Sequence, residues 1–403
     1  MINMIKSWIS KDTHGRDFYL LVVIGGLYSI GLFLSNTFVN VYLWRQTESF
    51  MTIAMYHIAI HISKPLTFYF AGNMSKKIDR IILLRLGVIF LSLFFLTVLL
   101  LQAKASYFNV LLGVLIGLGY GFYWLAFNVL TFEITEPYNR VFFNGLLGSL
   151  QSVSGMFGPL IAGIIISTLD TQVGYRTIFS ISFGLFIIAV ILSFFIERRE
   201  TDGVYNVLDV VREVRRNGDW RRVLLANSFQ GFRDSVFIFV LPIWIFLTTR
   251  NEFSLGIFNL IMHGASFFLF LLLSWKMKDN MRQRLLFLGS FVIGLSVLLL
   301  MGERDFYILL LYALIVGSMV PLFQVPFQAL TYDVIGKSYR ARDLRIEYIV
   351  LLEVFRSAGG ILSILLFILG LQLDSGPKAI PFILCVLSFA YMLIYPTVAS
   401  IER

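Results

Sequence analysis

The sequence contains a single cysteine, Cys385, among 403 residues. One thiol cannot form an intramolecular disulfide, and it excludes a metal site built from several cysteines. Charged residues are also scarce, at 14% of the chain, whereas 58% of the residues are hydrophobic. A water-soluble fold could not bury so much apolar surface. The composition therefore predicts that lipid is the solvent for much of the chain.

Motifs for chemistry are missing as well. The sequence has no Gly-x-x-x-x-Gly-Lys-Ser/Thr loop, which excludes ATP-driven transport by this chain alone. It has no constellation of metal ligands or of a nucleophile with its base, so we expect neither an enzyme nor a bound cofactor. Residues 1–17 mix charges without an apolar core or a cleavage site, so we expect no removable signal peptide.

Long apolar stretches recur along the whole chain, each near the ~20 residues that cross a bilayer as a helix. Runs such as 89–101 do not alternate polar and apolar residues, as the strands of a membrane barrel would. The pattern predicts an all-α membrane protein of twelve transmembrane helices. We place them at 18–43, 50–72, 81–103, 107–132, 141–169, 176–196, 222–248, 253–275, 285–302, 306–332, 347–370 and 379–398.

The basic residues predict the orientation of these helices. Most of the 33 Lys and Arg residues lie at the two chain ends and in the even-numbered joints. Because basic residues concentrate on the cytoplasmic side, both termini are expected in the cytoplasm. The net charge of +9 is explained by this placement, and we expect no nucleic-acid partner. The odd-numbered joints hold only Arg45, Lys104, Arg176, Arg250, Arg304 and Lys378.

The chain contains an internal repeat. The segment 127–134 reappears at 327–334, a shift of 200 residues, and the same shift pairs Gly117 with Gly317. A shift of 202 (61 to 263) pairs His61 with His263, and it also pairs Arg80 with Arg282, Lys76 with Lys278, and Gly87 with Gly289. Matched polar and glycine positions at nearly one shift indicate a duplication. With six spans in each copy, the repeats have the same orientation in the membrane.

The repeat divides the chain into three parts. We expect residues 1–196 to form an N-terminal six-helix bundle and 222–403 a C-terminal one, related by pseudo-symmetry. Residues 197–221 form a charged cytoplasmic linker, in which the spacing of apolar residues from Val207 to Val214 predicts an amphipathic helix. This helix either lies on the membrane surface or is a solvated spacer.

Two like-oriented six-helix halves joined by a cytoplasmic linker resemble the major facilitator superfamily of secondary transporters. Residues 72–80 are similar to its Gly-x-x-x-Asp-Arg-x-Gly-Arg-Arg loop, although Ser75 or Lys76 stands in place of the acid and the second glycine is missing. The resemblance implies that this loop forms a cytoplasmic gate. A simple cluster of basic residues on the cytoplasmic side explains the loop equally well. The gate residues here would be Lys76, Lys77, Asp79 and Arg80.

Two further stretches resemble the family. The fifth predicted helix carries small residues and a proline with the spacing of the antiporter motif, although generic small-residue packing also explains them. Beyond the fourth helix, Glu133 to Arg140 resembles the acid-to-arginine stretch, and Asp333 to Arg340 repeats it. The arginine that proton-coupled exporters carry within helix four is replaced by Leu115. The small-residue motif comprises Gly145, Ser154, Gly158, Pro159 and Gly163.

Ionisable residues inside spans are costly and are therefore candidates for coupling or gating. They are His61, Lys64, Arg233, Asp234, Glu353 and Arg356, together with His263. We hypothesise that Lys64 and Glu353 form an ion pair between the halves that breaks during transport. The alternative is that Arg233 or Asp234 neutralises Glu353 or Arg356 within one half. A histidine on an apolar helix is, however, more often a hydrogen-bonded packing residue.

The resemblance implies a solute pathway lined by helices one, four, seven and ten. Its candidate binding residues are Asn36, Asn40, Tyr120, Trp124, Asn128, Gln230, Arg233, Gln324 and Gln328, with Asn227 beside them. Some of these side chains would instead face lipid or pack between helices. An aromatic, amide-rich pathway suits an organic solute better than a bare inorganic ion.

We therefore expect a cell-membrane transporter that exports a small organic or amphiphilic solute by alternating access, coupled to protons. It would act as a monomer among membrane lipids. One alternative is an uptake carrier or a lipid-linked flippase that uses Arg233 or Arg356 to hold an anionic solute. Another is a sensor or scaffold that kept the fold without transporting.

Overall fold

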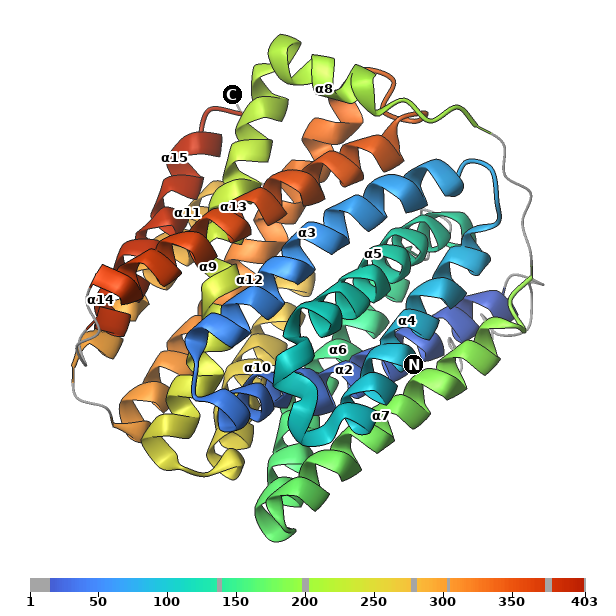
Figure 1. Ribbon diagram of the computed structural model, residues 1–403. Helices are drawn as coiled ribbons and strands as arrows, with labels where there is room; N and C mark the ends of the chain where they lie inside the picture. The colour runs from blue at the N-terminus through green and yellow to red at the C-terminus, as the bar shows by residue number, and fades with distance from the viewer. Residues whose placement is uncertain are drawn as a thin grey trace.

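The computed structural model describes residues 15–135, 140–197, 203–276, 281–302, 305–373 and 379–401. In these ranges the chain folds into long helices packed as one bundle, crossed at one end by the short helix α8 (Figure 1). The first half comprises α2 (Gly15–Thr47), α3 (Phe50–Met74), α4 (Arg80–Leu101), η1 (Gln102–Phe108), α5 (Asn109–Ile134), α6 (Arg140–Thr168) and α7 (Thr171–Ser193). The second comprises α8 (Val207–Arg216), α9 (Gly218–Thr249), α10 (Glu252–Lys276), α11 (Arg282–Ser296), η3 (Val297–Met301), α12 (Phe306–Lys337), α13 (Arg345–Leu373), α14 (Ala379–Ser388), η4 (Phe389–Leu393) and α15 (Ile394–Val398).

Each of the twelve predicted spans corresponds to a helical segment, with ends displaced by a few residues. Local capping explains one displacement: α9 begins at Gly218 rather than 222 because the Asn217 side chain accepts hydrogen bonds from the Asp219 and Trp220 amides. The predicted amphipathic helix of the linker is α8. The last span is the least regular, since α14, η4 and α15 follow one another with a 3₁₀ turn between them.

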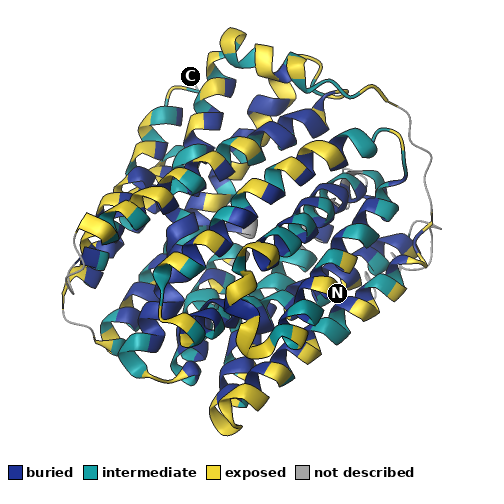
Figure 2. Ribbon diagram, viewed as in Figure 1, coloured by how far each residue is buried: buried dark blue, intermediate teal, exposed yellow. Residues whose placement is uncertain are grey.

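Within the described residues, ten stretches are long and apolar enough to cross a membrane, and one of them, Arg80–Thr131, covers both α4 and α5. The helix α3 is not among the ten because His57, His61 and Lys64 lower its hydropathy. Many large apolar residues are exposed, including Leu66, Phe70 and Phe268. Figure 2 shows exposed residues along the outer sides of the helices. An apolar exterior is what a lipid-embedded bundle requires.

The two halves use the same helix contacts. In the first, α5 packs on α3 and α4, and α2 packs on α6 and α7; in the second, α12 packs on α10 and α11, and α9 packs on α13 and α15. The repeated glycines show why. A Cβ on Gly87 would overlap the Tyr123 amide nitrogen, and one on Gly289 would lie 2.7 Å from the Phe323 amide nitrogen. Glycine at these positions lets the paired backbones touch.

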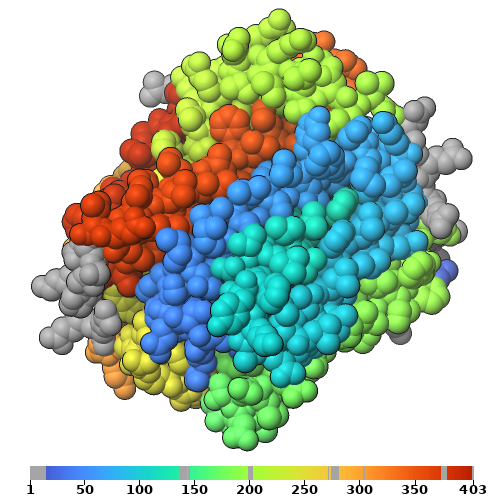
Figure 3. Space-filling view, in the orientation of Figure 1, coloured from blue at the N-terminus to red at the C-terminus, as the bar shows by residue number. Residues whose placement is uncertain are grey.

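The halves meet along two long seams, α3 against α13 and α6 against α10, with further contact between α2 and α9. Figures 1 and 3 show α3 and α13 side by side along the face turned to the viewer. We call the end where α3, α5 and α12 finish, beneath α8, the α8 end. The opposite end is where α2 connects to α3 and α9 to α10.

Candidate functional site

A cavity of about 510 Å³ lies between the two halves. Its lining comes from α3, α5, α9, α12 and α13, and therefore from both copies of the repeat. All of its lining residues belong to the parts of these helices nearer the α8 end. The lining includes Lys64, Phe68, Trp124, Asn128, Asn227, Gln230, Gln324, Phe327, Gln328, Tyr332, Glu353 and Arg356.

Five of the predicted binding residues line this cavity. Trp124 and Asn128 come from α5, and their repeat-related partners Gln324 and Gln328 come from α12. Gln230 comes from α9 and is buried. Because the duplication places equivalent helix faces around one space, residues 200 positions apart line the same cavity. Their part in binding a solute stays a prediction.

The other four predicted binding residues do not line this cavity. Asn36 and Tyr120 are partly buried in the first half. Asn40 is buried toward the opposite end, where its side chain is bonded to His57 and to the Ile238 carbonyl of α9. Arg233 is held inside the second half. A place for these four residues on the solute pathway stays a prediction.

Arg233 is enclosed by partners from its own half. Its guanidinium donates to Asp234 at 3.2 Å and to the Tyr312 hydroxyl at 2.8 Å, and it lies over the Phe237 ring. The Tyr391 hydroxyl donates in turn to Asp234 at 3.4 Å. The alternative that Arg233 or Asp234 neutralises Glu353 or Arg356 is not what the structure shows, since the two neighbouring residues pair with each other.

Lys64 and Glu353 form the ion pair that the sequence suggested. The Lys64 ammonium lies 2.7 Å from Glu353 Oε1, so α3 of one half is joined to α13 of the other at the cavity wall. The Ser357 hydroxyl donates to the same carboxylate oxygen at 3.1 Å. Both charged side chains are mostly buried. The hypothesis that this pair breaks during transport remains a prediction.

At the opposite end a second ion pair joins the halves, and sequence reasoning missed it. The Arg45 guanidinium of α2 lies 2.8 Å from Glu252 Oε1 at the start of α10, and the Tyr175 hydroxyl of α7 donates to the same oxygen at 3.2 Å. Glu252 is only 4% exposed. Arg45 also lies over the Phe246 ring of α9. The hydropathy pattern placed Arg45 and Glu252 at helix ends, where charges are common, so nothing marked them.

Histidines mark both seams. His61 packs against Gly360 of α13, and its repeat-related partner His263 packs against Gly155 of α6, so each reaches across to the other half. His57, also missed from the sequence, stacks on Phe239 of α9 at 4.8 Å. Its spacing from His61 and Lys64 along α3 is four and then three residues (57, 61, 64), which is the signal that could have found it.

The predicted gate residues at the α8 end form matched pairs. Arg80 pairs with Glu133 at 3.1 Å, and the repeat-related Arg282 pairs with Asp333 at 3.0 Å. Asp79 instead caps α4 by accepting from the Ile81 amide. Arg340 pairs with Asp343, whereas Lys77 is exposed. Lys278 lies outside the described residues, and the structure does not describe the side chain of Arg140 or the surroundings of Gly145.

The linker is held between the halves at this end. Glu347, at the start of α13, has no exposed surface; its carboxylate accepts from the Asn206 amide at 3.1 Å and lies 3.7 Å from the Lys76 ammonium. Lys76 also donates to the Asp343 carbonyl at 2.6 Å. Tyr205 packs on Gly72 of α3, and burial together with the Glu347 charge raises the pKa of its phenol. The linker therefore joins α3 and α13 instead of hanging free.

The small residues of α6 form part of the contact between halves. A Cβ on Gly163 would lie 2.8 Å from the Glu252 carbonyl oxygen, and one on Gly256 would lie 2.9 Å from the Pro159 carbonyl oxygen. Gly158 approaches α2 at Phe33 and Leu34, and Ser154 bonds within its own helix. The predicted close approach of backbones occurs here between α6 and α10.

We expect Gly256→Ala to destabilise the protein, because the new methyl group meets the backbone of α6 and no rotamer can relieve the clash. Overpacking of this kind costs about 1–3 kcal/mol. Thermal unfolding of the purified protein should show a midpoint lowered by several degrees. Gly184→Ala is the matched control, since nothing lies within 4 Å of its new Cβ. Equal midpoints for the two variants would contradict the close contact.

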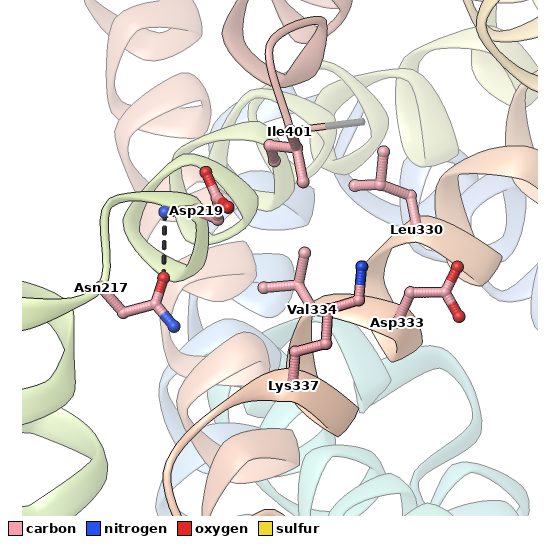
Figure 4. A pocket seen from close by; sticks show the side chains of 7 residues that line it. All are labelled: Asn217, Asp219, Leu330, Asp333, Val334, Lys337 and Ile401. Carbon is pink, nitrogen blue, oxygen red and sulfur yellow. Dashed lines mark hydrogen bonds between the residues drawn. The ribbon is translucent and has the colours of Figure 1, made fainter. Parts of the chain in front are cut away.

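A smaller cavity of about 90 Å³ lies at the surface of the α8 end (Figure 4). Two of its charged lining residues already form ion pairs, Asp219 with Arg222 and Asp333 with Arg282. Across the part of the chain that the structure describes, no group of three His, Cys, Asp or Glu residues could hold a metal ion. The larger cavity between the halves is therefore the candidate site.

Comparison with known proteins agrees with this architecture. The family model described as Major Facilitator Superfamily matches residues 21–363. This chain belongs to the Major Facilitator Superfamily. It is accordingly a multi-pass membrane protein that moves a small-molecule solute across a membrane, and not an enzyme.

Two bacterial proteins are similar in sequence to this superfamily member. The uncharacterized protein YqgE of Bacillus subtilis (strain 168) is 45% identical over 401 residues, covering 100% of this chain and 93% of that protein. An uncharacterized protein in the sodM 3' region of Geobacillus stearothermophilus is 57% identical over 169 residues, covering 42% of this chain and 79% of that protein.

Two solved structures share the fold. The human organic anion transporter MFSD10 (TETRAN) has a TM-score of 0.69, and a point mutant of the nucleoside transporter NupG has one of 0.72. Each is 11% identical in sequence, and each comparison covers 96% of this chain and 100% of the other. At that identity the likeness concerns the fold alone.

Proposed function

We propose that this superfamily member exports a small organic solute by alternating access, with protons as the coupling ion. The observation that carries the proposal is the contrast between the two ends of the bundle. A cavity lies between the halves toward the α8 end, while Arg45, Glu252 and Tyr175 close the opposite end. Access to one side at a time is the property that alternating access requires.

The α8 end is proposed to face the cytoplasm. Basic side chains gather there, among them Lys76, Arg80, Arg212 and Arg282. The positive-inside rule then places both chain termini in the cytoplasm of a cell-membrane protein. Residues 1–196 and 222–403 would move as two bodies joined by 197–221. Because one chain already encloses the cavity, a monomer suffices.

Proton coupling is proposed to act through the pair that joins the halves. Protonation of Glu353 would remove the negative charge that holds Lys64, and the α3–α13 seam could then open at the cavity. The direction of transport rests on the resemblance of the small-residue stretch in α6 to the antiporter motif, and that stretch does contact α10 of the other half. An uptake carrier or flippase would use the same cavity in reverse.

Flux through proteoliposomes with an imposed pH gradient tests this function. We expect gradient-dependent, saturable flux of an organic solute from a chemically broad panel, including neutral, anionic and cationic compounds. Flux in the proton-driven import direction would support the uptake carrier instead. Absence of flux for every solute would favour the scaffold and overturn the proposal. Liposomes without protein supply the background rate for each compound.

A further inference from the structure

The charges around the larger cavity do not cancel. Three charged side chains line it, Lys64, Glu353 and Arg356. Lys64 and Ser357 both bind the Glu353 carboxylate. Arg356 has no hydrogen bond or ion pair to any described residue, although it lies one turn from Glu353 on α13. Two cations and one anion leave the cavity wall with one positive charge.

The comparison with Arg233 shows that the unpaired state of Arg356 is particular to its position. Both arginines lie within spans of the second half and carry the same guanidinium. Arg233 has a carboxylate, a hydroxyl and two aromatic rings around it. Arg356 is half-buried and has no such partners. Because it is costly to take a cation out of water, a guanidinium left open to a cavity favours an anion from outside the chain.

Backbone packing fixes where Arg356 stands. At Gly231 of α9 a Cβ would overlap the Arg356 carbonyl oxygen, and at Gly359 a Cβ would overlap the Ser228 carbonyl oxygen. The two helices therefore touch on both sides of Arg356. The Ser228 hydroxyl adds a hydrogen bond to the Phe355 carbonyl at 3.0 Å. The backbone that carries Arg356 is therefore held in place, and the paired N–H donors of its guanidinium suit a planar, two-oxygen partner.

The remaining lining indicates the rest of the ligand. Trp124, Phe68 and Phe327 supply apolar and aromatic surface. Gln230 is 3% exposed, and its Oε1 has no hydrogen-bond partner among the described residues, so it can accept a bond from a ligand. A volume of about 510 Å³ is within the usual range for organic ligands.

We infer that the transported solute is an organic acid whose carboxylate, or a chemically similar oxyanion, binds Arg356. Its apolar body lies against Trp124 and the two phenylalanines, and a donor group on it reaches Gln230. The inference rests on the proposed transport function and adds the charge class of the solute. When Glu353 releases Lys64, the ammonium becomes a second cation for the same anion, which links solute binding to the opening of the seam.

Ligand-induced thermal stabilisation of the purified full chain tests the charge class. The probes are 2-naphthoate, 2-naphthamide and 2-naphthylmethylammonium, which share one ring system and differ in charge. We expect the carboxylate to raise the unfolding midpoint more than the other two at equal concentration. In Arg356→Gln the apparent Kd for the carboxylate, obtained from the concentration dependence, should rise at least about tenfold. Arg356→Lys keeps the positive charge but loses the paired N–H donors of the guanidinium, and it should bind the carboxylate with intermediate affinity.

Arg342→Gln is the matched control, because it removes the same charge from an exposed site near the α8 end. It should leave the preference for the carboxylate intact. Equal stabilisation of the wild type by the carboxamide or the amine would overturn the inference without any variant, and so would an undiminished preference in Arg356→Gln. Saturable flux of only neutral or cationic solutes would contradict the inferred charge of the solute but not the proposed transport function. Carboxylate binding that depends on Arg356, without flux of any solute, would instead contradict the proposed transport function.

Discussion

Lys64→Ala is expected to lower transport at least about tenfold, and Glu353→Ala should do the same. Each single substitution leaves the partner charge unpaired at a mostly buried seam, where truncating one member of an ion pair costs about 2–5 kcal/mol. The double variant removes both charges and should recover most of the lost stability. A double-mutant cycle on thermal stability and on proteoliposome flux measures the coupling between the two residues.

The charge-exchanged variant Lys64→Glu with Glu353→Lys separates an ion pair from two independent roles. It keeps one charge of each sign across the α3–α13 seam, so it should be more stable than either alanine variant. Additive losses in the cycle, with no recovery in the double variant, would mean that the 2.7 Å contact contributes nothing to transport. Recovery of stability without flux would indicate that a charged pair is needed for coupling.

Arg45→Gln is expected to shift the protein toward a state open at the opposite end. The substitution leaves the buried Glu252 carboxylate with only the Tyr175 hydroxyl as a partner. A loss of about 2–5 kcal/mol at such an interface corresponds to a population change of tenfold or more. Spin labels at Lys104→Cys and Leu373→Cys, which are exposed at that end in the two halves, report the separation. Replacing Cys385 by serine leaves these as the only thiols.

Two further variants test which contacts hold the opposite end together. Arg176 follows Tyr175 in the chain and forms no ion pair with a described residue. Arg176→Gln removes the same charge as Arg45→Gln and should leave the distance between the labels unchanged. Tyr175→Phe removes one hydrogen bond and should have a smaller effect than Arg45→Gln. Unchanged distances in Arg45→Gln would show that apolar packing, and not the ion pair, closes this end.

Much of the fold follows from the sequence because the duplication is visible at the positions that set helix spacing. Gly87 and Gly289, or Gly117 and Gly317, are recognisable as pairs, and each pair makes the same backbone contact in its half. The arginine and acid of the α8 end behave likewise, in Arg80 with Glu133 and Arg282 with Asp333. Each of these contacts lies within one half and is repeated in the other, so a pattern of residue types predicts them.

Contacts between the halves are harder to predict because the repeat does not determine them. Depth along a helix brought Lys64 and Glu353 together correctly. The resemblance placed Arg233 on the pathway, whereas its guanidinium is bonded within its own half. A sequence gives the depth of a side chain more readily than its rotation about the helix axis. Arg233 lies three positions after the cavity-lining Gln230, a turn of about 60° around the axis, and is enclosed by its own half. Arg45 and Glu252 escaped notice because charges at helix ends are ordinary.

The glycine contacts have a mechanical consequence. Inside each half, glycines bring main chain against main chain, which makes each half stiff, since no rotamer change can absorb a displacement. Between the halves, contacts are made by the ends of long side chains such as Lys64 and Arg45, which can move without displacing the backbone. The exception is the place where Gly163 and Gly256 bring α6 and α10 into backbone contact across the seam. Because both halves are stiff and the backbones meet directly at that crossing, we expect the halves to rotate about it during transport.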